Sequence, residues 1–340
     1  MRHVLTVFAF VAIAESFAMP ARALSLPSPL ADLQKTLTRV ANRAPGRVAM
    51  EIKDLPTGYV SAINPNRVMP AASTIKIPVM VEVFRQLAAG NFDLNRHMTL
   101  LGSDRDWGSG DIADAPVGST FSVSQLLAEM ITVSDNTAAN MLIRLVGRGN
   151  INATMRHLGL QHTKLTNYIR TDGWNVRTTL RTTAADMVRL LSDMAKKDLI
   201  DSWSSQQMIA ILERQEINSL IPEPLPDIPI AHKTGSLDDT LNDVGIVYAW
   251  NEPYVIAVMT TQLPTLSAGR RFIRRISSTA FNHLEQFAKW RELNGFVPQT
   301  QGTPAPDLPD ANSDTPIWAQ QTPLPATPDP EATPGAVATP

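Results

Sequence analysis

The spacing of hydrophobic and polar residues changes twice along this chain of 340 residues. Residues 48–53 and 59–63 have the pattern of short strands on either side of a Pro-Thr-Gly turn, which predicts a β-hairpin. Between residues 73 and 214, apolar residues recur at every third or fourth position, which predicts helices. Runs rich in Val and Ile then return and predict strands at 230–233, 243–250 and 254–261.

The middle segment therefore holds a series of helices, and one more helix follows the last strand. The predicted helices cover residues 73–89, 122–132, 137–146, 151–158, 183–197, 204–214 and 267–291. Because strands lie at both ends of the chain, we expect a mixed α/β fold of the α+β kind. One antiparallel sheet is built from both chain ends and flanked by helices, and an all-helical lobe (about 73–214) is inserted in it.

The two ends of the chain differ from the middle in composition. A basic start, an uncharged apolar run and a group of small residues have the layout of a signal peptide over residues 1–23, with cleavage expected after Ala18 or Ala23. Export to the periplasm, the cell envelope or the extracellular space follows, with no membrane span after cleavage. Residues 298–340 hold 11 of the 26 prolines and neither Lys nor Arg, so we expect a disordered tail. One domain, 24–297, remains.

Composition excludes several classes of function. Residues 24–297 contain 28 Lys and Arg against 26 Asp and Glu, and a formal charge of +2 gives no sign of nucleic-acid binding. The chain has no cysteine and its histidines lack the spacing of metal ligands, so we predict no disulfide, no metal and no other cofactor. The expected partner is a small molecule, and the protein is expected to be a monomer.

Three short motifs carry the candidate chemistry. Ser73-Thr74-Ile75-Lys76, Ser134-Asp135-Asn136 and Lys233-Thr234-Gly235 follow one another in this order along the chain. Each motif alone is a weak signal, but the three together indicate acyl transfer through a covalent serine ester. We expect them to meet at the seam between the sheet and the inserted lobe, where ligand sites often lie.

The spacing of the first motif suits an activated serine. A serine hydroxyl is a poor nucleophile and needs a neighbouring base. Lys76 follows Ser73 by about one helical turn, so its amine lies on the same face. A buried lysine beside a second cation loses its proton more easily and can then serve as that base.

The other two motifs supply groups for the substrate. The Ser134 hydroxyl can pass a proton to a leaving nitrogen, and the Asn136 amide can orient a substrate carbonyl. Lys233 provides positive charge for a substrate carboxylate, which Thr234 and Ser236 can also bind. Gly235 lets a substrate lie close to the strand edge.

These motifs and their surroundings resemble class A β-lactamases, within the penicillin-recognising serine hydrolases. Residues 131–140 are very similar to that family, as are 108–110, 183–187 and 233–236 followed by Asn242-Asp243, and the resemblance covers roughly residues 30–292. It implies the fold argued above and a site that opens β-lactam rings or cleaves peptidoglycan peptides. The resemblance also implies a role for each site residue. Ser73 is acylated, Lys76 is its proton partner, and Ser134 shuttles a proton. The substrate amide is bound by Asn136, and the substrate carboxylate is bound by Lys233, Thr234 and Ser236. The N–H groups of Ser73 and Ser236 form the oxyanion hole, and Trp107 lines the cleft mouth.

One departure from the family concerns deacylation. Class A β-lactamases carry a Glu, in an E-x-x-x-N pattern, that activates the water which frees the enzyme from its acyl ester. The best register places Ile169 at the position of that Glu and Gly173 at that of the Asn. Asp172 is the possible substitute, with a side chain one methylene shorter. Without a well-placed base, the acyl-enzyme is expected to persist.

Three functions therefore remain open from the sequence. The first is an exported β-lactamase-type serine hydrolase with slow deacylation. The second is a D-alanyl-D-alanine peptidase or an esterase, which shares the site and needs no Glu. The third is a non-catalytic binding protein of the cell envelope. Both enzymes form a covalent acyl adduct that a Ser73→Ala protein would lose, and this loss distinguishes them from the binding protein.

Overall fold

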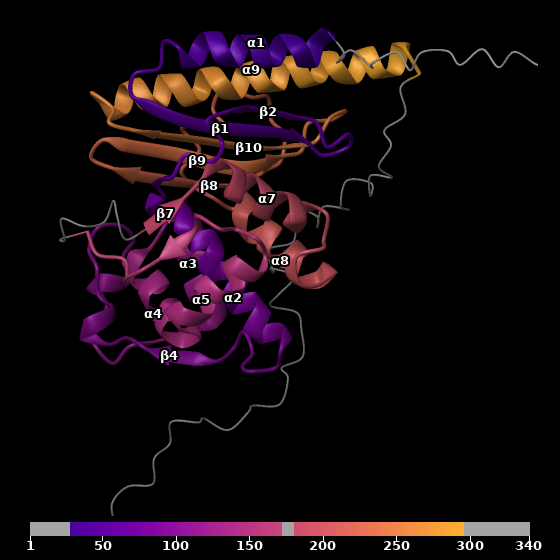
Figure 1. The fold of residues 1–340 in the computed structure, drawn as a ribbon. Helices are drawn as coiled ribbons and strands as arrows, with labels where there is room; N and C mark the ends of the chain where they lie inside the picture. Colours follow the sequence, from indigo (N-terminus) through magenta and orange to yellow (C-terminus); the bar gives the residue numbers. More distant parts are fainter. Residues whose placement is uncertain (1–27, 172–179, 296–340) are drawn as a thin grey trace, which may run out of the picture.

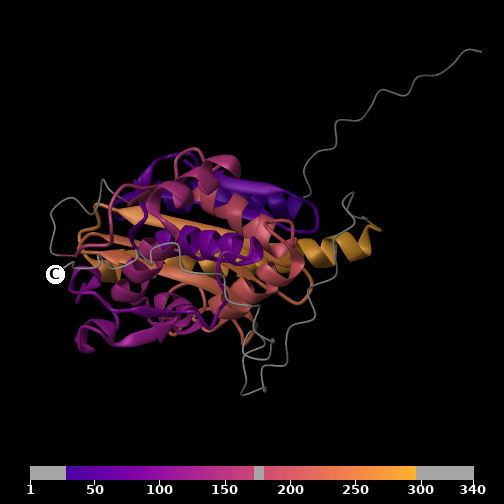
Figure 2. The same ribbon diagram turned by 90° about the horizontal axis from the view of Figure 1, so that it is seen from below.

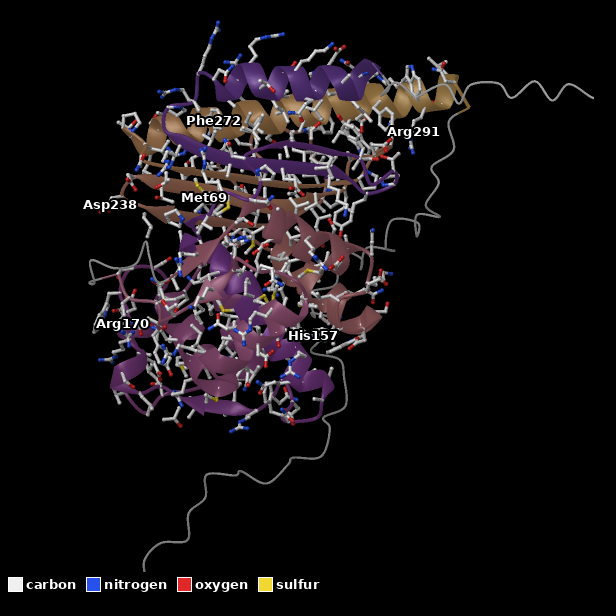
Figure 3. All side chains as sticks on the ribbon, viewed as in Figure 1. Met69, His157, Arg170, Asp238, Phe272 and Arg291 are labelled. Carbon is white, nitrogen blue, oxygen red and sulfur yellow. The ribbon has the colours of Figure 1, made fainter. Side chains whose placement is uncertain are left out.

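The computed structural model describes residues 28–171 and 180–295 of the chain. The predicted signal peptide, the Pro-rich tail and Asp172 lie outside the described residues. The side chains of the described part fill the space between the ribbons, as Figure 3 shows. Met69, labelled there, is buried between the sheet and the helical lobe.

A five-stranded antiparallel sheet is built from both ends of the chain, as predicted (Figure 1). In the order of the sheet, its strands are β2 (Val60–Ile63), β1 (Arg47–Asp54), β10 (Tyr254–Thr261), β9 (Thr240–Val247) and β8 (Ile230–Leu237). Every residue of β9 and β10 is buried, because helices cover both faces of the sheet. β10 is an almost continuous apolar run, as is typical of a strand covered on both faces, whereas β9 also buries the polar side chains of Asn242 and Asp243. The strand β8, which carries the third motif, lies at the sheet edge.

Two long helices cover the outer face of the sheet. They are α1 (Ser28–Ala41), which the sequence analysis did not predict, and α9 (Leu266–Leu293). The two helices lie side by side across the sheet in Figure 1. Leu33 and Leu37 of α1 and Phe272 and Ile276 of α9 belong to one core cluster with the outward-facing residues of the strands. This layer therefore forms from the first and last parts of the folded domain.

The inserted lobe packs against the inner face of the sheet. Its helices are α2 (Lys76–Ala88), α3 (Val123–Thr132), α4 (Asn136–Val146), α5 (Arg148–His157), α7 (Ala184–Ala195) and α8 (Ser202–Glu213). Seen from below, α2 runs through the middle of the lobe (Figure 2). All but two of its residues are buried, so this helix is enclosed on every side.

Side-chain caps fix where the helices on either side of the second motif begin. Ser122 accepts a hydrogen bond from Gln125 N and forms a capping box with that residue at the start of α3. Asp135 accepts a hydrogen bond from Ala138 N, 2.7 Å away, at the start of α4. The predicted boundaries of these two helices therefore agree with the structure to within one residue.

The structure corrects several details of the sequence prediction. The first motif does not open an α-helix: Ala72–Ile75 form a 3-10 turn, and α2 begins at Lys76. Pro78 lacks the N–H that would bond to the Thr74 carbonyl in an α-helix, which favours the tighter turn. β8 extends to Leu237, and β9 begins at Thr240 rather than at 243.

The inserted lobe is mainly but not wholly helical. Short strands also cross it, because the long connections between its helices pair with one another. One small sheet has the strand order β3 (Met69–Pro70), β7 (Leu180–Thr182) and β6 (Lys164–Leu165). A second pairs β4 (His97–Thr99) with β5 (Thr120–Ser122). Two 3-10 turns lie at Gly102–Asp104 and Ile112–Asp114. In the part of the chain that the structure describes, no helix is long and apolar enough to span a bilayer.

Candidate active site

The three motifs line one cavity between the sheet edge and the helical lobe. Its walls include residues of all three, Ser73, Ser134, Asn136, Thr234 and Gly235, together with Ser236. Lys76 and Lys233 lie behind this surface and are wholly buried. The seam between the two lobes is thus where the sequence placed the site.

The nucleophile candidate Ser73 lies on the 3-10 turn that precedes α2. Ala72 before it has a φ of 48°, which is uncommon for a residue with a side chain and turns the chain sharply. Among residues 28–171 and 180–295, the Ser73 hydroxyl has no hydrogen-bond partner, and it is partly exposed in the cavity wall. It is therefore free to meet a substrate.

Lys76 links the first motif to the second. Its Nζ lies 3.0 Å from Ser134 Oγ, 2.7 Å from Asn136 Oδ1 and 2.5 Å from the Ser134 carbonyl oxygen. Burial, and then the positive charge of Lys233, hold the pKa of Lys76 well below its usual value. Two of these contacts are to carbonyl oxygens, which only accept, so a neutral amine would use both its hydrogens on them and keep its lone pair for a hydroxyl proton.

A tight turn presents Ser134 and Asn136 to the cavity. Ser134 has a φ of 64°, and Asp135 Oδ2 accepts a hydrogen bond from Ile112 N at 2.9 Å. Gly110 lies against Asp135 so closely that a Cβ on the glycine would be 2.1 Å from Oδ2. Asn136 N donates to the Ser109 carbonyl at 3.0 Å. The loop at 108–112 therefore holds the second motif in place.

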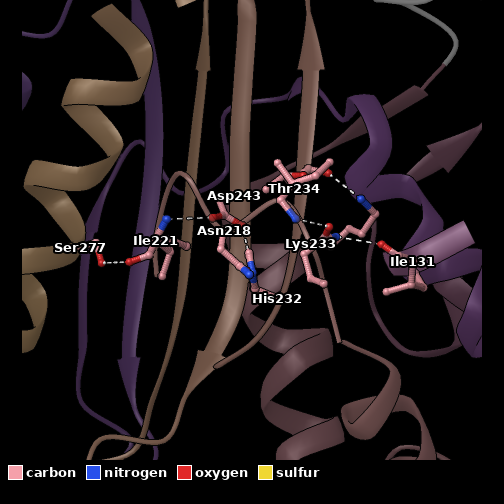
Figure 4. Close-up of polar contacts among 10 residues, drawn as sticks. Ile131, Asn218, Ile221, His232, Lys233, Thr234, Asp243 and Ser277 are labelled. Atoms are coloured by element: carbon pink, nitrogen blue, oxygen red, sulfur yellow. Dashed lines mark hydrogen bonds and ion pairs between the residues drawn. The ribbon is translucent and has the colours of Figure 1, made fainter. Parts of the chain in front are cut away.

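Lys233 lies on β8, beside Thr234 (Figure 4). Its Nζ donates to the Thr234 carbonyl at 3.2 Å, which leaves further N–H groups for a ligand. Burial lowers the pKa of Lys233 to about 7, and the charge of Asp243 acts in the opposite direction. Thr234 and Ser236, which both carry a hydroxyl group, line the cavity next to it.

A buried polar chain supports β8 from the outer side (Figure 4). His232 Nδ1 lies 3.0 Å from Asp243 Oδ1, and His232 Nε2 lies 2.9 Å from Asn218 Oδ1. Asp243 also accepts from Ile221 N at 2.9 Å. Gly245 makes room for the imidazole, because a Cβ there would be 2.6 Å from the His232 Cβ.

The structure places Ile169 in the cavity wall. Asn140 holds its backbone from both sides, accepting from Ile169 N at 2.8 Å and donating to the Ile169 carbonyl at 3.0 Å. The side chain is buried and lines the cavity. Among the described residues that line it, none carries a carboxylate. Trp107 is 67% exposed and lies beside the cavity rather than in its lining, next to Gly108.

Sequence reasoning missed several residues of the site, and two of them matter for its chemistry or shape. Ile217, in the connection between α8 and β8, forms part of the cavity wall, and no motif marks it. Asp106 is buried beneath the wall and bonds to Asn136, Gly108 and Thr171. The one available signal was Asp106 two residues before a glycine, a pattern typical of a turn. Within the described ranges, no cluster of His, Asp or Glu is arranged to hold a metal ion.

Comparison with known proteins agrees with this geometry. The model of the Beta-lactamase enzyme family matches residues 32–284. The chain is similar to the solved beta-lactamase from Sphaerobacter thermophilus, with 30% identity over 74% of this chain and 95% of that chain and a TM-score of 0.68. It is also similar to PBP-A, with 27% identity, 75% and 96% coverage and a TM-score of 0.71. A leucine-to-glutamate mutant of PBP-A, solved as an acyl-enzyme complex with penicillin G, is 27% identical with 76% and 97% coverage and a TM-score of 0.72.

Proposed function

The chain belongs to the beta-lactamase enzyme family, and from that premise we propose that it is an exported serine hydrolase that acylates Ser73 with β-lactams and releases the product slowly. One observation carries the proposal. A serine with a buried lysine behind it opens into a cavity whose described lining has no carboxylate. Such a site favours formation of the ester over its hydrolysis. Export is supported by the composition of residues 1–23.

Acylation in this proposal uses the buried Lys76 amine, which lies three residues after Ser73. In the proposed step, Ser73 Oγ attacks the lactam carbonyl while its proton passes to the neutral Lys76 amine. The ring C–N bond breaks, and the lactam nitrogen takes a proton from the Ser134 hydroxyl, which recovers one from Lys76 across their 3.0 Å contact. Ser73 N lies close to Gly235, and in the proposed step the N–H groups of Ser73 and Ser236 bind the oxyanion.

Slow release follows from the wall at Ile169. Hydrolysis of the ester needs a water molecule held and deprotonated beside the carbonyl carbon. The buried Ile169 side chain offers neither a hydrogen bond nor a base. Asp172 lies outside the described residues, so its part in deacylation stays a prediction.

A second candidate function uses the same machinery. A D-alanyl-D-alanine peptidase or an esterase also forms a Ser73 ester, and Lys233 would bind the terminal carboxylate of a peptide. The absence of a carboxylate from the described lining favours this candidate over a fast β-lactamase. A non-catalytic binding protein of the cell envelope is the third reading, and it predicts no covalent adduct.

The test is the intact mass of the mature protein mixed with penicillin G, followed over time beside a Ser73→Ala control. We expect a mass gain of one penicillin that persists long after mixing and is absent from the control. A gain that decays quickly while hydrolysed penicillin accumulates would overturn slow release. If no gain forms, the protein is next mixed with a thioester and with a D-alanyl-D-alanine peptide. Hydrolysis of either substrate indicates an esterase or a peptidase, and hydrolysis of neither indicates a protein without acyl-transfer activity.

A further inference from the structure

Asp106 is a buried carboxylate whose hydrogen-bond partners come from three different segments of the cavity lining. Its side chain is almost wholly inaccessible, and it lies two residues after the 3-10 turn at Gly102–Asp104. Its Oδ1 accepts hydrogen bonds from Asn136 Nδ2 at 2.7 Å and from Gly108 N at 3.0 Å. Its Oδ2 accepts from Thr171 N at 2.7 Å, and the Thr171 hydroxyl lies within 3.1 Å of both oxygens. Each donor belongs to a residue that lines the cavity.

The bond to Asn136 determines which way its amide faces. A carboxylate accepts hydrogen bonds and donates none, so the group of Asn136 that faces Asp106 must be the NH2. The amide oxygen then points the other way and lies 2.7 Å from Lys76 Nζ. If the amide were reversed, its oxygen would face the carboxylate and its NH2 would face the amine.

We propose that Asp106 is a positioning residue for acylation: it holds the Asn136 amide with its oxygen toward Lys76 and supplies negative charge that stabilises the proton Lys76 receives from Ser73. This inference rests on the proposed function for its catalytic consequence. The orientation of the amide and the charge near Lys76 are properties of the free protein and can be measured without a substrate.

The electrostatic part of the proposal depends on the groups that face Lys76. Lys233 approaches from β8 and opposes a second positive charge, whereas Asp135, at the start of α4, and Asp106 favour one. Asp106 itself stays ionised, because the hydrogen bonds from Asn136, Thr171 and Gly108 outweigh its burial and lower its pKa. The same filled oxygens make it a poor base for activating water, so it does not replace the missing glutamate.

The chain offers a matched control in the same loop. Asp104 is equally buried and is held by Arg144, whose Nη2 lies 2.9 Å from Asp104 Oδ2, but it contacts none of the three motifs. Asp104→Asn therefore removes a buried carboxylate from the same loop without removing the partner of Asn136. Asp106→Asn removes the charge, and Asp106→Glu keeps the charge while moving the carboxylate.

The first measurement is the titration of the Lys76 side chain by carbon NMR in the free protein, assigned through a Lys76→Arg variant. The midpoint is expected to move to lower pH in Asp106→Asn and to stay in place in Asp104→Asn. An unchanged midpoint in Asp106→Asn would overturn the electrostatic part, whether or not penicillin reacts. If Asp106→Asn does not fold, the acylation rate of Asp106→Glu still tests the positioning part.

The second measurement is the rate of acylation by penicillin G as a function of pH. In Asp106→Asn the rate at its plateau is expected to fall by about ten- to a hundredfold, with the acid limb moved to lower pH. In Asp106→Glu the acylation rate is also expected to fall, but the acid limb of its pH profile is expected to stay at the same pH. Equal rates in Asp106→Glu and the natural protein would overturn positioning. If the natural protein is not acylated but its Lys76 midpoint responds to Asp106→Asn, the proposed function fails and the inference about Asp106 stands.

Discussion

Gly235 on β8 lies against the backbone of Ser73, close enough that a Cβ on the glycine would be 3.0 Å from Ser73 N. The same atom would be 3.1 Å from the Ala71 carbonyl oxygen and from the Ala72 Cβ. The sheet edge and the turn that carries the nucleophile thus touch through main-chain atoms. Because the two pieces come from different lobes, the glycine sets the distance between them.

Gly235→Ala is expected to slow acylation and to lower the free energy of unfolding by about 1–3 kcal/mol, the usual cost of overpacking. The added methyl pushes β8 away from Ser73 and widens the spacing of the oxyanion donors. Stopped-flow acylation and urea denaturation measure the two effects. Gly102→Ala is the control, since a Cβ there meets nothing within 4 Å. Normal acylation in Gly235→Ala would show that the contact does not set the site geometry.

Ile169→Glu is expected to speed deacylation by about two to four powers of ten, because it places a general base in the cavity wall. Intact-mass decay of the penicillin adduct gives the rate. Ile169→Gln, similar in size but without a base, should keep a persistent adduct. If glutamine and glutamate act alike, the cause of slow release lies elsewhere in the cavity.

The Lys233 ammonium should make binding of a carboxylate depend on pH. Its pKa is lowered to about 7 by burial, so the side chain loses its charge as the pH rises through that value. The acylation rate of penicillin G relative to its methyl ester should therefore fall above pH 7, because the ester lacks the carboxylate. Lys233→Arg keeps its charge and should remove this pH dependence. A constant ratio in the natural protein would exclude Lys233 as the carboxylate ligand.

Glu213, at the end of α8, should lower stability in neutral solution. Burial raises its pKa from 4.5 to about 7, and its Oε1 has no hydrogen-bond partner among the described residues. Below pH 4.5 both the folded and unfolded states keep the proton, so the group costs nothing. Between pH 4.5 and 7 only the folded state keeps it, and the free energy of unfolding falls as pH rises.

Glu213→Gln should therefore raise the free energy of unfolding by up to about 3 kcal/mol above neutral pH and leave it unchanged in acid. Urea denaturation at the two extremes measures the difference. An equal gain at both would mean that the substitution acts through packing rather than through the charge.

The sequence predicted those parts of the site that depend on residue type and order. The three motifs, the antiparallel sheet from both ends and the inserted lobe follow from periodicity and from chemistry that needs these residues together. Ile169, which the sequence analysis placed at the position of the missing base, lines the cavity, and its correspondence to that base stays a prediction.

The parts that could not be predicted depend on contacts between distant segments. Asp106 acquires its role only when residues 136 and 171 come within hydrogen-bond distance of it. The 3-10 turn at Ser73 reflects the missing N–H of Pro78, which the helical periodicity does not reveal. The short strands of the lobe have two or three residues each, too few for an alternating pattern to be recognised.

The pairing of α1 with α9 determines where a fusion partner or a solid support can be joined to the domain. In Figure 1 the start of α1 and the end of α9 lie at the same end of the sheet. In Figure 3, Arg291 of α9 lies at that end, whereas Arg170 and Asp238, whose neighbours Ile169 and Leu237 line the cavity, lie at the other. A fusion partner or a solid support joined at either end of the domain would therefore leave the cavity mouth unobstructed, and linking the two ends would permit new termini elsewhere.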